Sequence, residues 1–288
     1  MHFQQTLNAY GSLSVFNWLR LPAKAARVVT VHEFDPYQLD FPNSNLAYNE
    51  ADRVIVHVQD LKDRLVEFGV HASRIDIVEH GVEIGPLSEG PRSGIIFYGG
   101  HRLHSGKGLD TLFKAMQIIK GRLGPATPQL TIHGHYGDTT PEFALRLAED
   151  HAVSENVRWL NQIPLKQVAE EYGRALLCVL PYTGSFAGFA AVNAMANGVP
   201  VIGTRRAGLP EHLGSAAVWV EEHDAEGLAA NIQRLVGDAA ERQRLARAGR
   251  ERAERLLSWD AIAEKTLQSY RAALEHKLEK ASSNLAGS

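Results

Sequence analysis

The segment from Leu180 to Glu211 constrains the fold of this chain more than any other. The apolar residues 176–180 predict a buried strand that ends at Pro181, and a loop rich in Gly, Ser and Ala follows. A helix of small residues then opens near Gly188, and the Gly-Val-Pro run at 198–200 begins the next buried strand. This order of strand, loop, helix and strand predicts a parallel α/β sheet.

The loop after the strand has the composition of a phosphate-binding loop. Small residues at Gly184, Ser185, Ala187 and Gly188 let a ligand approach the backbone closely. The amides at the start of the following helix point into the same space with the positive end of the helix dipole. The segment therefore predicts a site for a phosphate-bearing ligand.

The spacing within the segment resembles that of retaining GT-B glycosyltransferases, and of family 4 among them. Those enzymes carry a proline, a glutamate four residues later, a GFG-like loop, a second glutamate eight residues after the first, and then AMA, a glycine and PV. Here Pro181, Phe186-Ala187-Gly188 and the run 194–201 keep this frame. Ser185 and Asn193 stand where the family has its two glutamates.

This resemblance implies a donor site on the same residues. In the family the first glutamate holds hydroxyls of the donor sugar and the second accepts from the nucleotide ribose. Ser185 and Asn193 are expected to make these contacts through neutral groups, which bond less strongly than charged ones. The expected donor-binding residues are Ser185, Phe186, Ala187, Gly188, Phe189 and Asn193.

A second glycine-containing run, residues 99–108, carries two cations, Arg102 and, five residues later, Lys107. The matching loop of the family places both cations on the donor diphosphate, and the resemblance implies the same here. Two cations beside a leaving diphosphate neutralise the charge that grows in the transition state. A solvated surface loop is the alternative interpretation.

Histidine is frequent, with 13 residues, which raises the question of a metal site. The pairs 133/135 and 101/104 do not complete a ligand set by themselves. Enzymes of the GT-B class need no bound metal, so none is expected. His32 ends a predicted strand, and the matching histidine of the family contacts the donor sugar or its phosphate. His32 is therefore a candidate for the catalytic site, with a structural role as the open alternative.

The resemblance implies a GT-B-like architecture, in which two Rossmann-like doubly wound domains face a cleft and the N-terminal one is incomplete. Residues 1–88 are expected to form the partial first domain, and residues 89–257 the nucleotide-sugar-binding domain. A Gly-, Pro- and Ser-rich linker is placed at 84–94. Residues 258–288 are expected to form a helix that crosses back to the first domain and ends in a frayed tail.

Short apolar runs and amphipathic patterns predict the individual elements. In the first domain we expect strands at 27–32, 53–58 and 75–78, and a helix at 60–68 capped by Asp60. In the second domain we expect strands at 95–98, 130–133 and 157–160 that alternate with helices at 110–120, 141–151 and 165–172. The alternation predicts a parallel sheet that binds its ligand at the carboxyl ends of the strands.

Composition narrows the classes of partner. A net charge of −3, with no basic stripe between aromatic residues, argues against nucleic acid. One cysteine, Cys178, permits no disulfide framework, and no apolar run approaches the length of a membrane span. No signal-peptide pattern begins the chain. A cytoplasmic location is expected, with peripheral association at the inner face of a membrane as a second option.

The sequence therefore predicts a retaining hexosyltransferase. It is expected to move a sugar from a UDP- or GDP-linked donor to an unidentified hydroxyl acceptor, without a cofactor. The departing phosphate itself assists the acceptor in the family mechanism, so no protein nucleophile is needed. The alternative is a weak or inactive sugar-nucleotide-binding module or partner subunit, which the replacement of both glutamates favours. A second copy or another chain is expected to complete the first domain.

Overall fold

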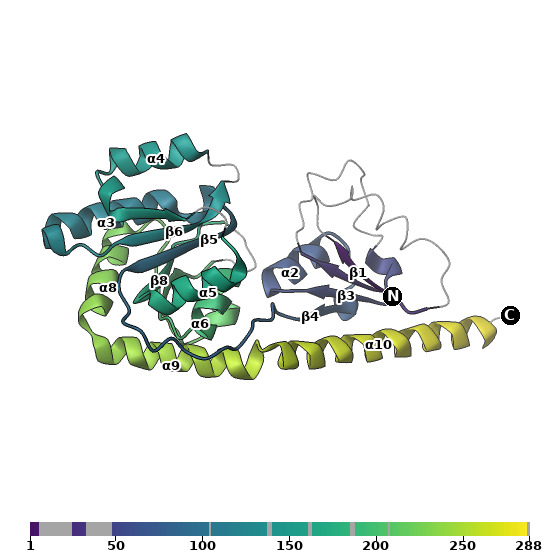
Figure 1. The fold of residues 1–288 in the computed structure, drawn as a ribbon. Coiled ribbons are helices and arrows are strands. Elements are labelled where there is room, and N and C mark those ends of the chain that lie inside the picture. Colours follow the sequence, from purple (N-terminus) through teal and green to yellow (C-terminus); the bar gives the residue numbers. More distant parts are fainter. Residues whose placement is uncertain are drawn as a thin grey trace. The chain divides into compact units, whose positions relative to one another are not determined.

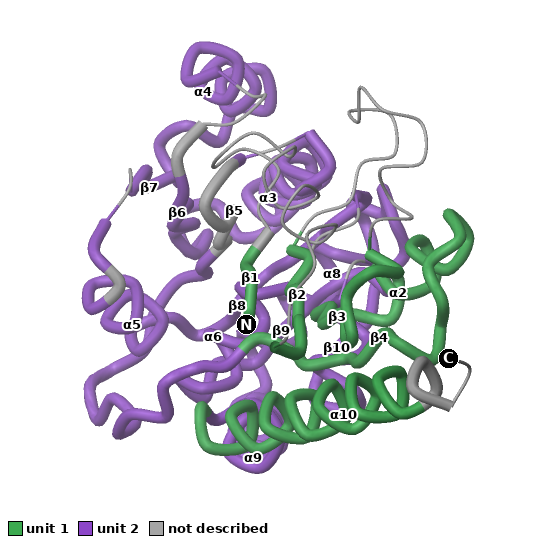
Figure 2. The backbone as a smooth tube through the Cα atoms, turned by 90° about the vertical axis from the view of Figure 1, so that its right-hand side faces the viewer, with its two compact units in different colours: residues 1–80, 259–288 green, residues 81–258 purple. Residues whose placement is uncertain are grey.

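The computed structural model describes residues 1–5, 25–32, 48–103, 105–136, 140–160, 163–184, 188–206 and 208–286. Two compact units make up the chain, as Figure 2 shows by colour. Unit 1 consists of residues 1–80 together with residues 259–288, and unit 2 consists of residues 81–258. The expected linker at 84–94 thus belongs to unit 2. Among the described helices, none combines the length and the apolar character that crossing a membrane requires.

Unit 2 is a six-stranded parallel sheet with helices on both faces (Figure 1). Its strands follow the order β10-β9-β8-β5-β6-β7, and the predicted α/β fold class is confirmed. The strands are β5 (Ile95–Leu103), β6 (Leu130–Tyr136), β7 (Val157–Leu160), β8 (Leu177–Leu180), β9 (Val201–Thr204) and β10 (Ala217–Val220). The helices are α3 (Leu109–Leu123), α4 (Pro141–Asp150), α5 (Leu165–Arg174), α6 (Phe189–Ala196), α7 (Leu209–Leu213), α8 (Ala225–Gly237) and α9 (Ala239–Leu256).

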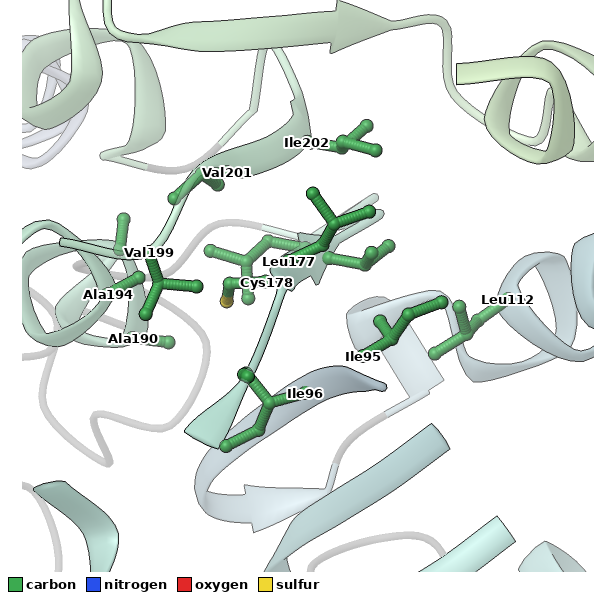
Figure 3. Close-up of a cluster of buried hydrophobic side chains, with 14 of the residues drawn as sticks. Ile95, Ile96, Leu112, Leu177, Cys178, Ala190, Ala194, Val199, Val201 and Ile202 are labelled. Carbon is green, nitrogen blue, oxygen red and sulfur yellow. The ribbon is translucent and has the colours of Figure 1, made fainter. Parts of the chain in front are cut away.

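The core of unit 2 forms where strands with apolar side chains on both faces meet helices with small or branched residues. Strands β8 and β9 are buried at every position, which is typical of a parallel sheet covered on both sides. Helix α6 contributes mainly alanines to the core, and small side chains let a helix pack close to the strands. Figure 3 shows this cluster with Ile95, Ile96, Leu112, Leu177, Cys178, Ala190, Ala194, Val199, Val201 and Ile202. Burial raises the pKa of the Cys178 thiol, as expected for a structural cysteine.

Unit 1 is a smaller parallel sheet with the strand order β1-β2-β3-β4. Its elements are β1 (His2–Gln5), β2 (Val28–Val31), β3 (Arg53–Val56), α2 (Gln59–Glu67), β4 (Ile75–Ile77) and α10 (Trp259–Ala286). Leu61 and Leu65 of α2 belong to one apolar cluster with β2 and β3. Ile262 and Ala273 of α10 belong to a second cluster with Val28 and Ile55. Two separate clusters therefore cover the two sides of the sheet.

Two local predictions are wrong in detail. Helix α2 begins at Gln59, and Val58 precedes it without a side-chain cap, so Asp60 lies in the first turn, where a carboxylate favours the helix dipole. Strand β5 continues past Tyr98 to Leu103 through an irregularity in its pairing with β6. Helix α10 continues through Ala286, and the frayed end of the tail stays a prediction.

Candidate functional site

The strand order of unit 2 places a switch point between β5 and β8. Strands β6 and β7 extend the sheet on one side of β5, whereas β8, β9 and β10 extend it on the other. Loops that leave the carboxyl ends of the two central strands therefore diverge to opposite faces of the sheet. A doubly wound sheet binds its ligand in the crevice that this divergence opens. The two loops in question are those that the sequence singles out.

Backbone hydrogen bonds join these two loops. The Gly106 carbonyl accepts from the amides of Thr183 at 2.8 Å and Gly184 at 3.0 Å. Gly108 has φ of +76°, and a Cβ added there would lie 1.9 Å from the Pro181 carbonyl oxygen. Only glycine fits this position without displacing the facing backbone. The loop that holds Lys107 is thus fixed against the loop that leads into α6.

Lys107 ends a 3-10 turn at the switch point and is only 8% exposed. Its Nζ lies 4.2 Å from the centroid of the Tyr182 ring, a cation–π distance. Burial lowers the pKa of the Lys107 ammonium to about 7. A cation whose charge is disfavoured by burial gains much from a bound anion, which makes Lys107 suited to a phosphate.

Helix α6 follows the loop that is joined to the Lys107 loop. Gly188 precedes it with φ of +72°, and a Cβ there would lie 2.8 Å from Cδ2 of the buried His212. Phe189, at the first helical position, is 37% exposed. Asn193 lies one turn further, half-buried, and its Nδ2 donates to the Phe189 carbonyl at 3.1 Å. The amide end of α6 and Asn193 therefore belong to one short surface.

Several predicted donor-binding residues lie outside the described part of the chain. These are Ser185, Phe186 and Ala187. The backbone of Arg102 pairs with His135 on the neighbouring strand, and the Arg102 side chain lies outside the described part. The structure brings Lys107, Gly188, Phe189 and Asn193 to the same edge of one sheet, and the roles of all the predicted site residues stay predictions.

His32 belongs to unit 1, where it follows β2. Its Nδ1 lies 3.1 Å from Nε2 of His57, and its Nε2 lies 2.6 Å from Oε1 of Gln4. The ring of His80 lies 6.2 Å from that of His32. The contact between His32 and a donor that the resemblance implies stays a prediction.

Sequence reasoning missed three residues that shape these sites. Tyr182 faces Lys107, and the only local signal is its position one residue after Pro181 at a strand end. His57 and His80 join His32, and each lies at or just beyond the end of a predicted strand. Because neighbouring parallel strands end at one edge of their sheet, strand-end histidines were the signal that could have grouped them.

Comparison with known proteins gives a family match in unit 2. The family described as "Glycosyl transferases group 1" matches residues 89–252. A D-inositol 3-phosphate glycosyltransferase of Segniliparus rotundus is 30% identical over 241 residues, which cover 78% of this chain and 53% of that protein. A glycogen synthase of Mycobacterium tuberculosis is 29% identical over 233 residues, 78% of this chain and 55% of that protein. The chain spans about half the length of these two relatives.

Solved structures share the fold over nearly the whole chain. The sucrose-phosphate synthase of Thermosynechococcus elongatus superposes with a TM-score of 0.74 at 25% sequence identity. The match covers 95% of this chain and 73% of that one. Both units, including the small sheet of unit 1, thus have counterparts in a solved structure.

Proposed function

Because the chain belongs to the glycosyl transferases group 1 family, we propose that it transfers a sugar from a nucleotide-diphosphate donor to a hydroxyl acceptor with retention of configuration. UDP and GDP are the proposed carriers, and the chemistry is of the family 4 type. One observation carries the proposal. The buried cation Lys107 lies at the switch point of the sheet, in a loop joined by hydrogen bonds to the loop before α6.

The proposed role of Lys107 follows from the charge of the leaving group. When the bond between sugar and diphosphate breaks, negative charge accumulates on the diphosphate oxygens. An ammonium and a helix amino terminus that face those oxygens stabilise that charge more than they stabilise the intact donor. Lys107 and the amino end of α6 thus bind and orient the diphosphate. The departing phosphate oxygen accepts the proton of the acceptor hydroxyl.

A second candidate function rests on a specific observation, the presence of Ser185 and Asn193 where related enzymes carry glutamates. Loss of two carboxylates removes charge-assisted hydrogen bonds from the donor site. A protein altered in this way can bind sugar nucleotides without turning them over. The second candidate is therefore a sugar-nucleotide-binding module.

The test is a titration of wild type, Lys107→Ala and the control Lys114→Ala with UDP, GDP, uridine and guanosine. Lys114 is exposed on α3 and pairs with Asp110, so its loss should leave binding unchanged. Removing Lys107 should weaken diphosphate binding by about 10- to 150-fold, the worth of one charge-assisted bond, and leave nucleoside binding unchanged. Equal diphosphate affinity in wild type and Lys107→Ala would refute the site.

Turnover distinguishes the two candidate functions. An enzyme should lose more in the rate of donor consumption than in donor affinity when Lys107 is removed, because the cation acts most strongly in the transition state. Donor hydrolysis and transfer are measured with UDP-sugars and GDP-sugars. Tight donor binding without any consumption in wild type would favour the binding module.

A further inference from the structure

Three histidines gather at the carboxyl edge of the unit 1 sheet. His32 follows β2, His57 follows β3 and His80 lies shortly after β4, and these three strands are neighbours in that order. One ring nitrogen from each histidine can be chosen so that all three lie within 4.8 Å of one another. The rings of His57 and His80 lie 3.9 Å apart, and those of His32 and His57 lie 4.8 Å apart.

The outer contacts of two rings favour one placement of the ring hydrogens. Nδ1 of His57 lies 2.8 Å from the Val78 carbonyl oxygen, which can only accept, so Nδ1 donates. Nε2 of His32 likewise donates to Oε1 of Gln4 at 2.6 Å. With the hydrogens placed so, Nε2 of His57 and Nδ1 of His32, which lie 3.1 Å apart, are the nitrogens that can bind a metal ion.

A positive centre between these two nitrogens stabilises this arrangement of the rings. A shared proton would require one ring to be an imidazolium, whereas a metal ion accepts both lone pairs with the rings neutral. Histidine ligands of metals almost always donate their second ring N–H to a carbonyl or carboxylate. The Val78 carbonyl and the Gln4 amide oxygen supply those partners here.

We propose that His32, His57 and His80 bind one transition-metal ion of the zinc type. Zinc–nitrogen bonds of about 2.0–2.1 Å in tetrahedral geometry place ligand nitrogens about 3.3 Å apart, close to the 3.1 Å between His32 and His57. His32 and His80 are half-buried, so rotation of their rings can close the wider separations. Imidazole suits zinc, copper, nickel and iron, whereas calcium and magnesium select oxygen ligands.

Metal binding at this site can be tested separately from the proposed transferase activity. All three ligands lie in unit 1, and Lys107 lies in unit 2. The assignment also gives His32 a role different from the donor contact that the resemblance implies. A metal titration contains no nucleotide, so its outcome is separate from that of the diphosphate titration.

The test uses the full chain without an affinity tag, stripped of metal with a chelator and titrated with Co²⁺ and Zn²⁺. We expect one equivalent of Co²⁺ to bind with the visible absorption of a tetrahedral site, and Zn²⁺ to displace it. His80→Asn and His32→Gln should each weaken Zn²⁺ binding by at least about tenfold, the lower bound for losing even a supporting residue of a metal site. His71→Asn, which changes an exposed histidine of the same unit, should bind like wild type.

Wild-type protein that develops no visible Co²⁺ absorption would overturn the proposal. Equal Zn²⁺ affinity in wild type, His80→Asn and His32→Gln would also overturn it, because binding would then occur elsewhere on a histidine-rich chain. Circular dichroism identifies any variant that fails to fold, and the wild-type titration decides the question without the variants. Binding of Mg²⁺ with similar affinity would contradict a nitrogen-ligand site.

Discussion

Both units contain a parallel sheet, but different side chains lie at the carboxyl edge of each sheet. In unit 2 the strand order reverses between β5 and β8, and the edge carries an ammonium, a helix amino terminus and small loops. In unit 1 the described strands follow one another in sequence order, and the edge carries three imidazoles. Cations and amides favour anions, whereas neutral imidazoles favour metal ions. Parallel sheets thus bind ligands at their carboxyl edge, and the residue types at that edge determine which kind of ligand binds.

The largest expected effect compares the cores of the two units. Leu112 of α3 and Leu65 of α2 are both fully buried. Truncation of either one to alanine should lower the unfolding free energy of the protein by about 2–5 kcal/mol. We expect Leu112→Ala to cost more, because its larger cluster extends over both faces of a six-stranded sheet and can relax less around a cavity. Urea denaturation measures both values, and Leu145→Ala, at an exposed position, serves as the control. The reverse order would show that the small core is the less adaptable one.

The next effect concerns the junction of the two loops in unit 2. Gly108→Ala should destabilise the protein by roughly 2–4 kcal/mol, because a left-handed backbone costs an L-residue and the new Cβ would collide with the Pro181 carbonyl. Diphosphate binding should weaken as well, since the Lys107 loop moves. Gly121→Ala, in open space on α3, should be neutral or slightly stabilising. Thermal melting of both variants checks this, and an unchanged melting temperature for Gly108→Ala would contradict the tight junction.

Much of unit 2 is predictable from sequence because its signals are local. Apolar runs bounded by Pro181 or Gly198 define strands, and the spacing from Pro181 to Val201 predicts the candidate site. Contacts between residues far apart in the sequence leave no local signal, so the features that depend on such contacts were not predicted. Strand β1 has only one apolar residue, Phe3, and forms by pairing with β2 across a long intervening segment. The burial of Lys107 likewise depends on Tyr182, which belongs to another loop.

A smaller effect comes from pH. With the pKa of Lys107 near 7, the free protein loses this charge as pH rises through 7, whereas a bound diphosphate holds the proton on. Between pH 7.5 and 9.5 diphosphate affinity should therefore fall by up to about tenfold per pH unit, and Lys107→Met should lack this dependence. The unfolding free energy should rise with pH over the window from about 7 to 10.5, because only the unfolded chain binds the proton there. Calorimetry in buffers of different ionisation enthalpy measures the proton uptake on diphosphate binding. If diphosphate affinity depended on pH equally in wild type and Lys107→Met, a buried phosphate-binding lysine would be contradicted.

The smallest effect tests whether the edge of unit 2 reads the nucleoside as well as the phosphates. Asn193 lies one helical turn beyond Phe189, and Asn193→Glu places a carboxylate where a ribose hydroxyl would donate. Exchanging a neutral bond of about 0.5–1.5 kcal/mol for a charged one of about 1.5–3 kcal/mol should tighten UDP or GDP binding by roughly fivefold. The variant loses the hydrogen bond from the half-buried Asn193 amide to the Phe189 carbonyl, so the melting temperature should change little.

The control for this variant is a diphosphate whose ribose lacks both the 2′ and 3′ hydroxyls. The gain from Asn193→Glu should vanish with that ligand, because the new carboxylate then has no hydroxyl to accept from. A gain that persists would mean that the carboxylate acts through the charge or stability of α6 and not through the ribose. Unchanged or weaker affinity for the ordinary nucleotide would remove the ribose contact altogether. The comparison of the two edges would then rest on Lys107 in unit 2 and on the three histidines in unit 1.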